Sequence, residues 1–238
     1  MARAGRLLLD VVREAFPRED AAALIAAGGV LVDGVPVTST RSRVRAGAHV
    51  STRPASALRG AVKLRAALQE FDVAVSGRVA LDVGAAAGGF TTALLDAGAR
   101  RVYAVDAGHG QLLGSLRQDE RVINLEAVNI AELDTTLVPD TVEVISIDVS
   151  YLSLSGAVAQ LDRLRIAPGA ILIGLVKPMF ELRAATAPSD RASLDAALAA
   201  ASAGVTAAAW EIRGWIDSPV TGRRGARELL LHAVRSPR

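Results

Sequence analysis

The stretch LDVGAAAGGFTTALL, residues 81–95, joins an apolar strand to a helix through a turn of small residues. We expect the strand to end at Asp82 and Gly84 and the helix to begin near Gly88. Small residues in such a turn let a ligand approach the backbone closely. The spacing differs from the G-x-G-x-x-G dinucleotide fingerprint, and the turn lacks the lysine of a phosphate-binding P-loop. The turn therefore predicts a ligand site of another class.

Short apolar strands alternate with helical stretches from Val79 almost to the end of the chain. After the first strand, in RVALDVG, the others are expected in RVYAVDAG, RVINLEA, VEVISIDVS, AILIGLVKP, WEIRGWIDS and RELLLHAV. The alanine-rich segment 194–210 is expected to be a covering helix. This alternation predicts an α/β fold with a mostly parallel sheet and right-handed crossovers. Ligands of such sheets bind at the carboxyl ends of the strands.

Polar side chains follow the next two strands at the edge where the glycine turn lies. Asp106 ends the second strand, where a carboxylate can accept hydrogen bonds from both hydroxyls of a ribose. Asn129, after the third strand, is a candidate for contact with an adenine edge. The glycine turn resembles the D-x-G-x-x-x-G-G-[FW] turn of S-adenosylmethionine-dependent methyltransferases of the FtsJ-like group. This resemblance implies a Rossmann-like class I methyltransferase domain whose cofactor contacts are Asp82, Gly84, Ala85, Gly88, Gly89, Phe90, Asp106, Asn129 and Asp148.

Positive charge is distributed unevenly along the chain. Residues 1–59 hold nine arginines and five acidic residues, whereas the remainder holds slightly more acidic than basic residues. An excess of arginine at one end is typical of an attached nucleic-acid-binding segment.

The absence of cysteine and the short length of the apolar runs exclude several classes of protein. There is no cysteine, which excludes disulfides, thiolate metal sites and a cysteine nucleophile. The first apolar run is too short and too charged for a signal peptide. No run reaches the roughly 18 apolar residues of a membrane span. We therefore expect a cytoplasmic protein with no membrane partner.

The first fifty residues are expected to form a small basic α+β module. Residues 6–15 and the segment after Arg18 are predicted helices, the second of which ends at Gly28. Short strands then flank a turn at Asp33-Gly34.

The module resembles the small RNA-binding domain named for the fourth ribosomal small-subunit protein. The pattern L-I-x-x-G-x-V-x-V-D-G at residues 24–34 carries this resemblance. It implies RNA contacts from Arg3, Arg6, Arg18, Arg41 and Arg43. The domain bounds we expect are 1–50 for the RNA-binding domain, 51–60 for a linker and 61–238 for the methyltransferase domain.

Only two lysines, Lys63 and Lys177, accompany 25 arginines in the chain. Lys177 ends the fifth strand and Asp148 the fourth, while Lys63 lies on a helix before the first strand and Glu228 begins the last. Transfer of a methyl group to a hydroxyl requires alignment of the attacking oxygen. A nearby ammonium stabilises negative charge on that oxygen, and a guanidinium differs from it in shape and cannot accept a proton. Lys177 is therefore expected at the hydroxyl, oriented by Asp148, with Lys63 and Glu228 completing the site.

The order Lys-Asp-Lys-Glu is that of 2′-O-ribose RNA methyltransferases. With the basic module in front, residues 3–234 are similar to the TlyA family of ribosomal RNA 2′-O-methyltransferases, once labelled hemolysins. The resemblance implies methylation of a cytidine ribose in ribosomal RNA, with S-adenosylmethionine as cofactor and without a metal.

Two segments depart from the family's pattern, and they leave alternatives open. LRAATAPSDRASLDAAL after Glu181 replaces a glycine-rich stretch, and the loop DSPVTGRRGAR before Glu228 carries additional arginines. Both border the expected acceptor site. The first hypothesis is an RNA 2′-O-methyltransferase, the second is a small-molecule O-methyltransferase, and the third is a non-catalytic RNA-binding protein or a pore-forming hemolysin.

Overall fold

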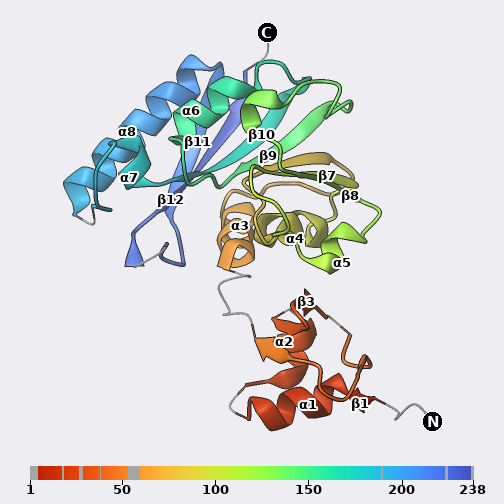
Figure 1. The fold of residues 1–238 in the computed structure, drawn as a ribbon. Helices are drawn as coiled ribbons and strands as arrows, with labels where there is room; N and C mark the ends of the chain where they lie inside the picture. The colour runs from red at the N-terminus through yellow and green to blue at the C-terminus, as the bar shows by residue number, and fades with distance from the viewer. Residues whose placement is uncertain are drawn as a thin grey trace.

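The computed structural model describes two parts of the chain, a small N-terminal module and a larger α/β domain (Figure 1). The described residues are 5–17, 19–26, 29–37, 39–52, 59–188, 190–222 and 225–236. Each part has its own apolar core.

A seven-stranded sheet forms the centre of the α/β domain, in the order β11-β12-β10-β9-β6-β7-β8. The strands are β6 (Val79–Val83), β7 (Arg101–Asp106), β8 (Val122–Glu126), β9 (Val142–Ile147), β10 (Ile166–Val176), β11 (Trp210–Asp217) and β12 (Leu229–Arg235). Strands β6 to β10 are parallel to one another, whereas β12 lies antiparallel between β10 and β11. All seven predicted strands are present, and the predicted α/β class is confirmed.

Helices cover both faces of this sheet (Figure 1). Helices α3 (Arg59–Glu70), α4 (Gly89–Asp96) and α5 (Gly114–Arg117) lie on one face. Helices α6 (Leu154–Val158), α7 (Pro178–Glu181) and α8 (Arg191–Ala207) lie on the other. The expected alanine-rich helix is α8. Two short 3-10 helices, η2 (Ile130–Glu132) and η3 (Ala159–Leu161), complete the connections.

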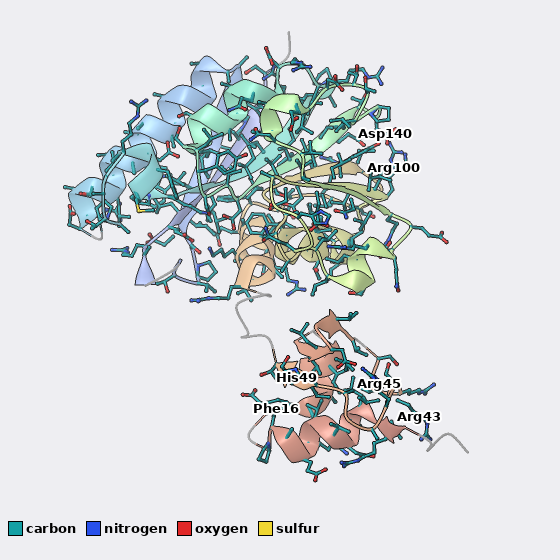
Figure 2. The ribbon with its side chains drawn as sticks, in the orientation of Figure 1. Phe16, Arg43, Arg45, His49, Arg100 and Asp140 are labelled. Atoms are coloured by element: carbon teal, nitrogen blue, oxygen red, sulfur yellow. The ribbon has the colours of Figure 1, made fainter. Side chains whose placement is uncertain are left out.

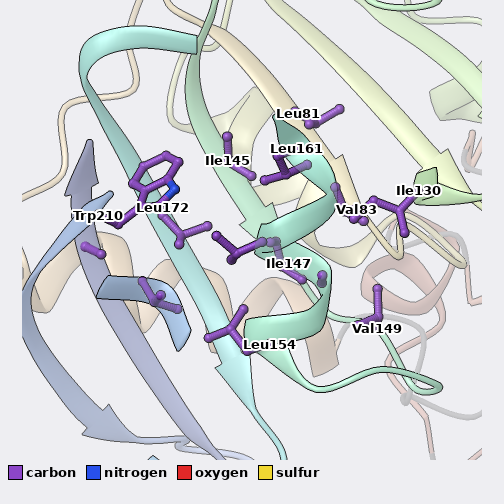
Figure 3. Packing of buried hydrophobic residues seen from close by; sticks show 14 of the residues in the cluster. Leu81, Val83, Ile130, Ile145, Ile147, Val149, Leu154, Leu161, Leu172 and Trp210 are labelled. Atoms are coloured by element: carbon purple, nitrogen blue, oxygen red, sulfur yellow. The ribbon is translucent and has the colours of Figure 1, made fainter. Parts of the chain in front are cut away.

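The two cores follow the two-residue alternation of the strands. Leu81 and Ile145 face α6 and α8, in a cluster that includes Trp210 (Figure 3). Their neighbours Ala80 and Val144 belong to the opposite cluster, under α3 and α4. Because both faces are covered, the central strands are apolar throughout, as parallel sheets require. One buried carboxylate, that of Asp82, interrupts this pattern.

The N-terminal module packs two helices against short antiparallel strands. Its elements are β1 (Arg6–Leu7), α1 (Leu8–Ala15), α2 (Ala21–Ala26), β2 (Val30–Val32), β3 (Val35–Pro36), β4 (Arg43–Val44) and β5 (Val50–Thr52). The expected turn joins β2 to β3 with Asp33 and Gly34 at φ 50° and 82°, the left-handed pair that a tight hairpin needs. The first helix begins at Leu8 because Arg6 and Leu7 pair with β4 instead.

The expected domain bounds shift slightly between the two parts. Strand β5 pairs with β2, so the module continues to Thr52 rather than ending at residue 50. Helix α3 begins at Arg59. Residues 53–58, most of the expected linker, lie outside the described residues, as do Arg3, Arg18 and Gly28. Across the described parts of the chain, no helix is long and apolar enough to cross a membrane.

Candidate active site

The glycine turn after β6 lies against the end of β9 and against helix α5. Gly84 has φ 86°, and a Cβ there would lie 2.3 Å from the carbonyl oxygen of Asp148. Gly88 has φ 93°, and a Cβ there would lie 2.1 Å from Leu116. At Gly84 both conformation and a backbone contact exclude a side chain, whereas at Gly88 the positive φ disfavours one and the leucine side chain would have to move. The turn holds the end of β6 directly against the end of β9.

Asp106 holds the turn from the end of β7. Its Oδ2 accepts a hydrogen bond of 2.8 Å from the amide of Ala86, and Oδ1 accepts one of 2.7 Å from the amide of Gly108. The carboxylate is half-buried and keeps lone pairs beyond these two contacts. It therefore lies beside the turn with capacity to accept from a ligand's hydroxyls.

Asn129 has a structural contact at the place where an adenine edge was expected. Its Oδ1 accepts from the amide of Ala131 at 3.0 Å, and Glu132 accepts from the Asn129 amide at 2.7 Å. This reciprocal pair is a capping box for η2. The side-chain oxygen is thus engaged, and the amide NH₂ of this exposed residue is the group left for a ligand.

Asp82 lies inside the sheet rather than at its surface. Its carboxylate is fully buried and accepts from Thr91 Oγ1 at 2.6 Å and from Ser146 Oγ at 2.9 Å. Burial first, and to a smaller extent the charge of Asp148, raise the pKa of Asp82 to about 6, against the lowering effect of these two hydrogen bonds. Direct contact with a cofactor, as expected from the sequence, would need this carboxylate to be accessible. We propose instead that it fixes α4 to β6 and β9 through Thr91 and Ser146.

Ala85, Gly89 and Phe90 pack the turn against α3. Ala85 and Phe90 are buried in the core, and a Cβ on Gly89 would lie 3.0 Å from the backbone of Gly60. The two glycines let α3 and α4 cross closely. This crossing fixes the position of Lys63, one turn along α3.

Lys63 and Glu228 form a buried ion pair. The Nζ of Lys63 lies 2.5 Å from Oε2 of Glu228, and the two side chains are 8% and 7% exposed. Gly222 packs against the same carboxylate, since a Cβ there would lie 2.2 Å from Oε1. Glu228 lies immediately before β12 rather than within it.

Lys177 and Asp148 form a second, more accessible pair. The Nζ of Lys177 lies 2.6 Å from Oδ1 of Asp148, with side chains 14% and 24% exposed. The same Nζ donates at 2.8 Å to the carbonyl of Val149 and at 2.8 Å to Oγ of Ser150. Two hydrogen bonds and one ion pair therefore fix the position of the ammonium.

The strand register brings the two pairs to one edge of the sheet. Val176 pairs with Leu229 across β10 and β12, so Lys177 and Glu228 occupy the next opposed positions. Val83 pairs with Ile147 across β6 and β9, which places Gly84 beside Asp148. Because β12 is antiparallel, its beginning meets the carboxyl ends of β6, β9 and β10. All four predicted polar residues and the glycine turn therefore lie at the same edge of the sheet, which we call the rim.

Three contributors to this rim have no obvious signal in the sequence. Thr91 and Ser146 hold Asp82 from two distant segments, and Ser150 holds Lys177. Only the position of Ser150, two residues after Asp148, gives a hint. No group of three or more histidine, cysteine, aspartate or glutamate side chains that could hold a metal occurs in the described residues.

The described arginines of the N-terminal module are exposed, and some are already paired. Arg6 contacts Glu14, and Arg43 donates to the carbonyl of Gly5 at 2.8 Å. Arg41 is exposed near the start of β4. Figure 2 shows Arg43 together with Arg45, which lies 3.1 Å from Asp33. The amide of His49 and the guanidinium of Arg45 lower the pKa of Asp33.

Seven strands in this order, with a glycine turn after β6 and an acid after β7, define a Rossmann-like methyltransferase. A family model described as FtsJ-like methyltransferase matches residues 57–233. The chain is 40% identical over 188 residues to the 16S/23S rRNA (cytidine-2′-O)-methyltransferase TlyA of Mycobacterium tuberculosis, covering 76% of this chain and 70% of that protein.

Two solved structures extend the similarity. A hemolysin-like protein from Lactococcus lactis superposes with a TM-score of 0.71 and 31% identity, covering 75% of this chain and 88% of that one. Another from Streptococcus thermophilus gives a TM-score of 0.69 and 27% identity, covering 99% and 90%. The chain belongs to the FtsJ-like methyltransferase family and, within it, to the TlyA group.

Proposed function

We propose that this methyltransferase transfers the methyl group of S-adenosylmethionine to the 2′-hydroxyl of a cytidine in ribosomal RNA. The observation that carries the proposal is the pair of lysine–carboxylate contacts, Lys177 with Asp148 and Lys63 with Glu228, beside the glycine turn. The name of the M. tuberculosis relative states the same reaction. It favours RNA over the small-molecule and non-catalytic alternatives. A ribosomal substrate would place the reaction in the cytoplasm.

The residues present fit S-adenosylmethionine. The turn at Gly84 lies against the backbone of Asp148 and is built of small residues, so a ligand beside the turn would meet few side chains. Asp106 would accept from the ribose hydroxyls, and the amides at the start of α4 would hold the carboxylate. When bound, the cofactor supplies an electrophilic methyl group on a sulfonium.

Lys177 is positioned to orient and stabilise the attacking oxygen. Its ammonium is held by Asp148 and by the carbonyl of Val149, so little reorganisation is needed as negative charge develops on the attacking oxygen. The exposed hydroxyl of Ser150 is the acceptor that a ribose hydroxyl can replace. Lys63 and Glu228, which are more deeply buried, form the floor of the site.

The N-terminal module would hold the RNA while the nucleotide enters the rim. Its described arginines are exposed, and charge contacts with phosphates are strongly salt-dependent. Arg41 carries no ion pair to another described residue, and Arg43 is bonded only to a carbonyl. We therefore assign RNA contact to Arg41 and Arg43, together with Arg6, whose pairing with Glu14 is exposed to solvent. Arg3 and Arg18 remain candidates from the sequence alone.

The test is transfer of labelled methyl groups from S-adenosylmethionine to ribosomal subunits and to protein-free ribosomal RNA. A 2′-O-methyl group blocks alkaline cleavage at the adjacent phosphodiester, so the label should appear in an alkali-resistant dinucleotide that begins with cytidine. Lys177→Arg should lower transfer by about 10²- to 10⁴-fold while cofactor binding, measured by calorimetry, is retained. Arg213→Ala, on the exposed edge strand β11, is the matched control. Label on a base, or equal transfer by Lys177→Arg, would contradict the proposal.

A further inference from the structure

A cavity of about 430 Å³ is lined by two segments that closely follow Asp148 and Lys177 in the sequence. Tyr151, Leu152 and Ser153 follow Asp148, whereas Met179, Phe180, Arg183 and Ala184 follow Lys177. The volume lies within the range of small-ligand pockets. A ligand bound here would contact the segments that directly follow the two residues of the Lys177–Asp148 pair.

An aromatic ring is exposed at this cavity. Tyr151 is 49% exposed, which is unusual for a large side chain so close to the core of the domain. Partial burial and the charge of Asp106 raise the pKa of Tyr151, against the lowering effect of a hydrogen bond from the amide of Ile130. The exposed part of the side chain is left for contact with a flat ligand. Exposed aromatic faces stack unpaired bases in single-stranded RNA.

Arg183 provides the polar group of the cavity. It is exposed and forms no hydrogen bond or ion pair with any residue that the structure describes. Other arginines of the domain are paired, for example Arg65 with Asp96 and Arg101 with Asp140. Its backbone is also in the left-handed region, with φ 51°. Arg183 directly follows Leu182, the C-cap of α7, and a left-handed residue at this position ends the helix.

We propose that this cavity receives the base of the acceptor nucleotide and that Arg183 recognises cytosine through its N3 and O2 atoms. The inference rests on the proposed function, because the base belongs to the ribose whose hydroxyl meets Lys177. The guanidinium offers two parallel N–H donors, and cytosine presents two adjacent acceptors on its Watson–Crick edge. Uracil presents an N3–H donor in place of one of them. A bidentate contact of this kind discriminates by about 10- to 100-fold against the wrong base.

The test uses one RNA fragment containing the mapped methylation site, made with either cytidine or uridine at that position. The native chain should show a kcat/KM at least about tenfold higher for cytidine. Arg183→Gly relieves the left-handed strain and removes the donors. It should lower kcat/KM about 10- to 100-fold for cytidine, leave that for uridine unchanged and so abolish the preference. Arg183→Lys keeps the positive charge but lacks the two parallel N–H donors, so it should also lose most of the preference for cytidine. Arg213→Ala should behave as the native chain.

Three outcomes would overturn the inference alone. An equal loss for cytidine and uridine in Arg183→Gly, with a weaker dependence on salt, would make Arg183 a phosphate contact. An unchanged preference would show that the base is recognised elsewhere. Native transfer without any preference would also contradict it, and would leave the proposed function standing. Absence of native transfer to any RNA would instead overturn the proposed function, and this inference with it.

Discussion

Lys63 and Glu228, 165 residues apart in the sequence, form the most buried ion pair of the rim, with Nζ 2.5 Å from Oε2. The Lys177–Asp148 pair beside it is more exposed. Burial removes both Lys63 and Glu228 from water, so each depends on the other for its charge to be tolerated. The Lys63–Glu228 pair is therefore needed for the structure of the site, and it is also a candidate to take part in methyl transfer.

Glu228→Gln should reduce the free energy of unfolding by about 3 kcal/mol, because it leaves the Lys63 ammonium buried without a carboxylate. Urea unfolding followed by circular dichroism measures this. The double variant Lys63→Met, Glu228→Leu should recover most of the stability, since it removes both charges at similar volume, yet it should not recover methyl transfer. Full activity in the double variant would show that the pair has only a structural role.

Ser150→Ala should change kcat/KM by no more than a few-fold, whereas Asp148→Asn should lower it by about 10²-fold. The reason is the exposure of Ser150, whose hydroxyl is the acceptor that an incoming ribose oxygen can replace at Lys177. Asp148 instead holds the ammonium from a half-buried position. Steady-state methyl transfer with RNA as the varied substrate measures both. A loss in Ser150→Ala as large as that in Asp148→Asn would mean that Ser150 takes part directly.

The sequence predicted the strands and one half of the rim well. Asp148 and Lys177 end consecutive parallel strands, and the ends of such strands meet at one edge. The contact between Lys63 and Glu228 could not be predicted in this way. It depends on β12 lying antiparallel between β10 and β11, and on the close crossing of α3 and α4 at Gly60 and Gly89. Both are tertiary arrangements that leave no local pattern.

For Asp82 we propose a structural role in place of the cofactor contact that the sequence predicted. An acid in an apolar strand next to a glycine turn is typical of a ligand contact, and local pattern cannot show where hydrogen-bond donors lie. The structure supplies them from Thr91 on α4 and Ser146 on β9, which makes the carboxylate internal.

Gly84→Ala should weaken S-adenosylmethionine binding by tenfold or more and destabilise the fold by about 1–3 kcal/mol. The new Cβ would lie 2.3 Å from the carbonyl of Asp148, and φ 86° disfavours any side chain. Gly114→Ala is the matched control, since a Cβ there meets nothing within 4 Å and its φ lies outside the left-handed region. Calorimetry with the cofactor and thermal unfolding measure the two effects. Equal behaviour of the two variants would contradict the close approach of β6 and β9 at this turn.

Asp82 should give the protein a stability that declines between about pH 4 and pH 6. Burial raises the pKa of Asp82 from 3.8 in the unfolded chain to about 6 in the fold, so the folded state binds more protons in this window. The contribution is fully present below the pKa of the unfolded chain and is lost as the pH rises through the pKa of the folded one.

Asp82→Asn removes the titration, and its amide can still bond with the Thr91 and Ser146 hydroxyls. Relative to the native chain, it should therefore gain up to about 3 kcal/mol of unfolding free energy between about pH 4 and about pH 8. Urea unfolding of both proteins across this range measures the difference, in which all other titrating groups cancel. A difference that stays constant with pH would show that the pKa of Asp82 is the same in the folded and unfolded chain. This would contradict the prediction that burial raises it.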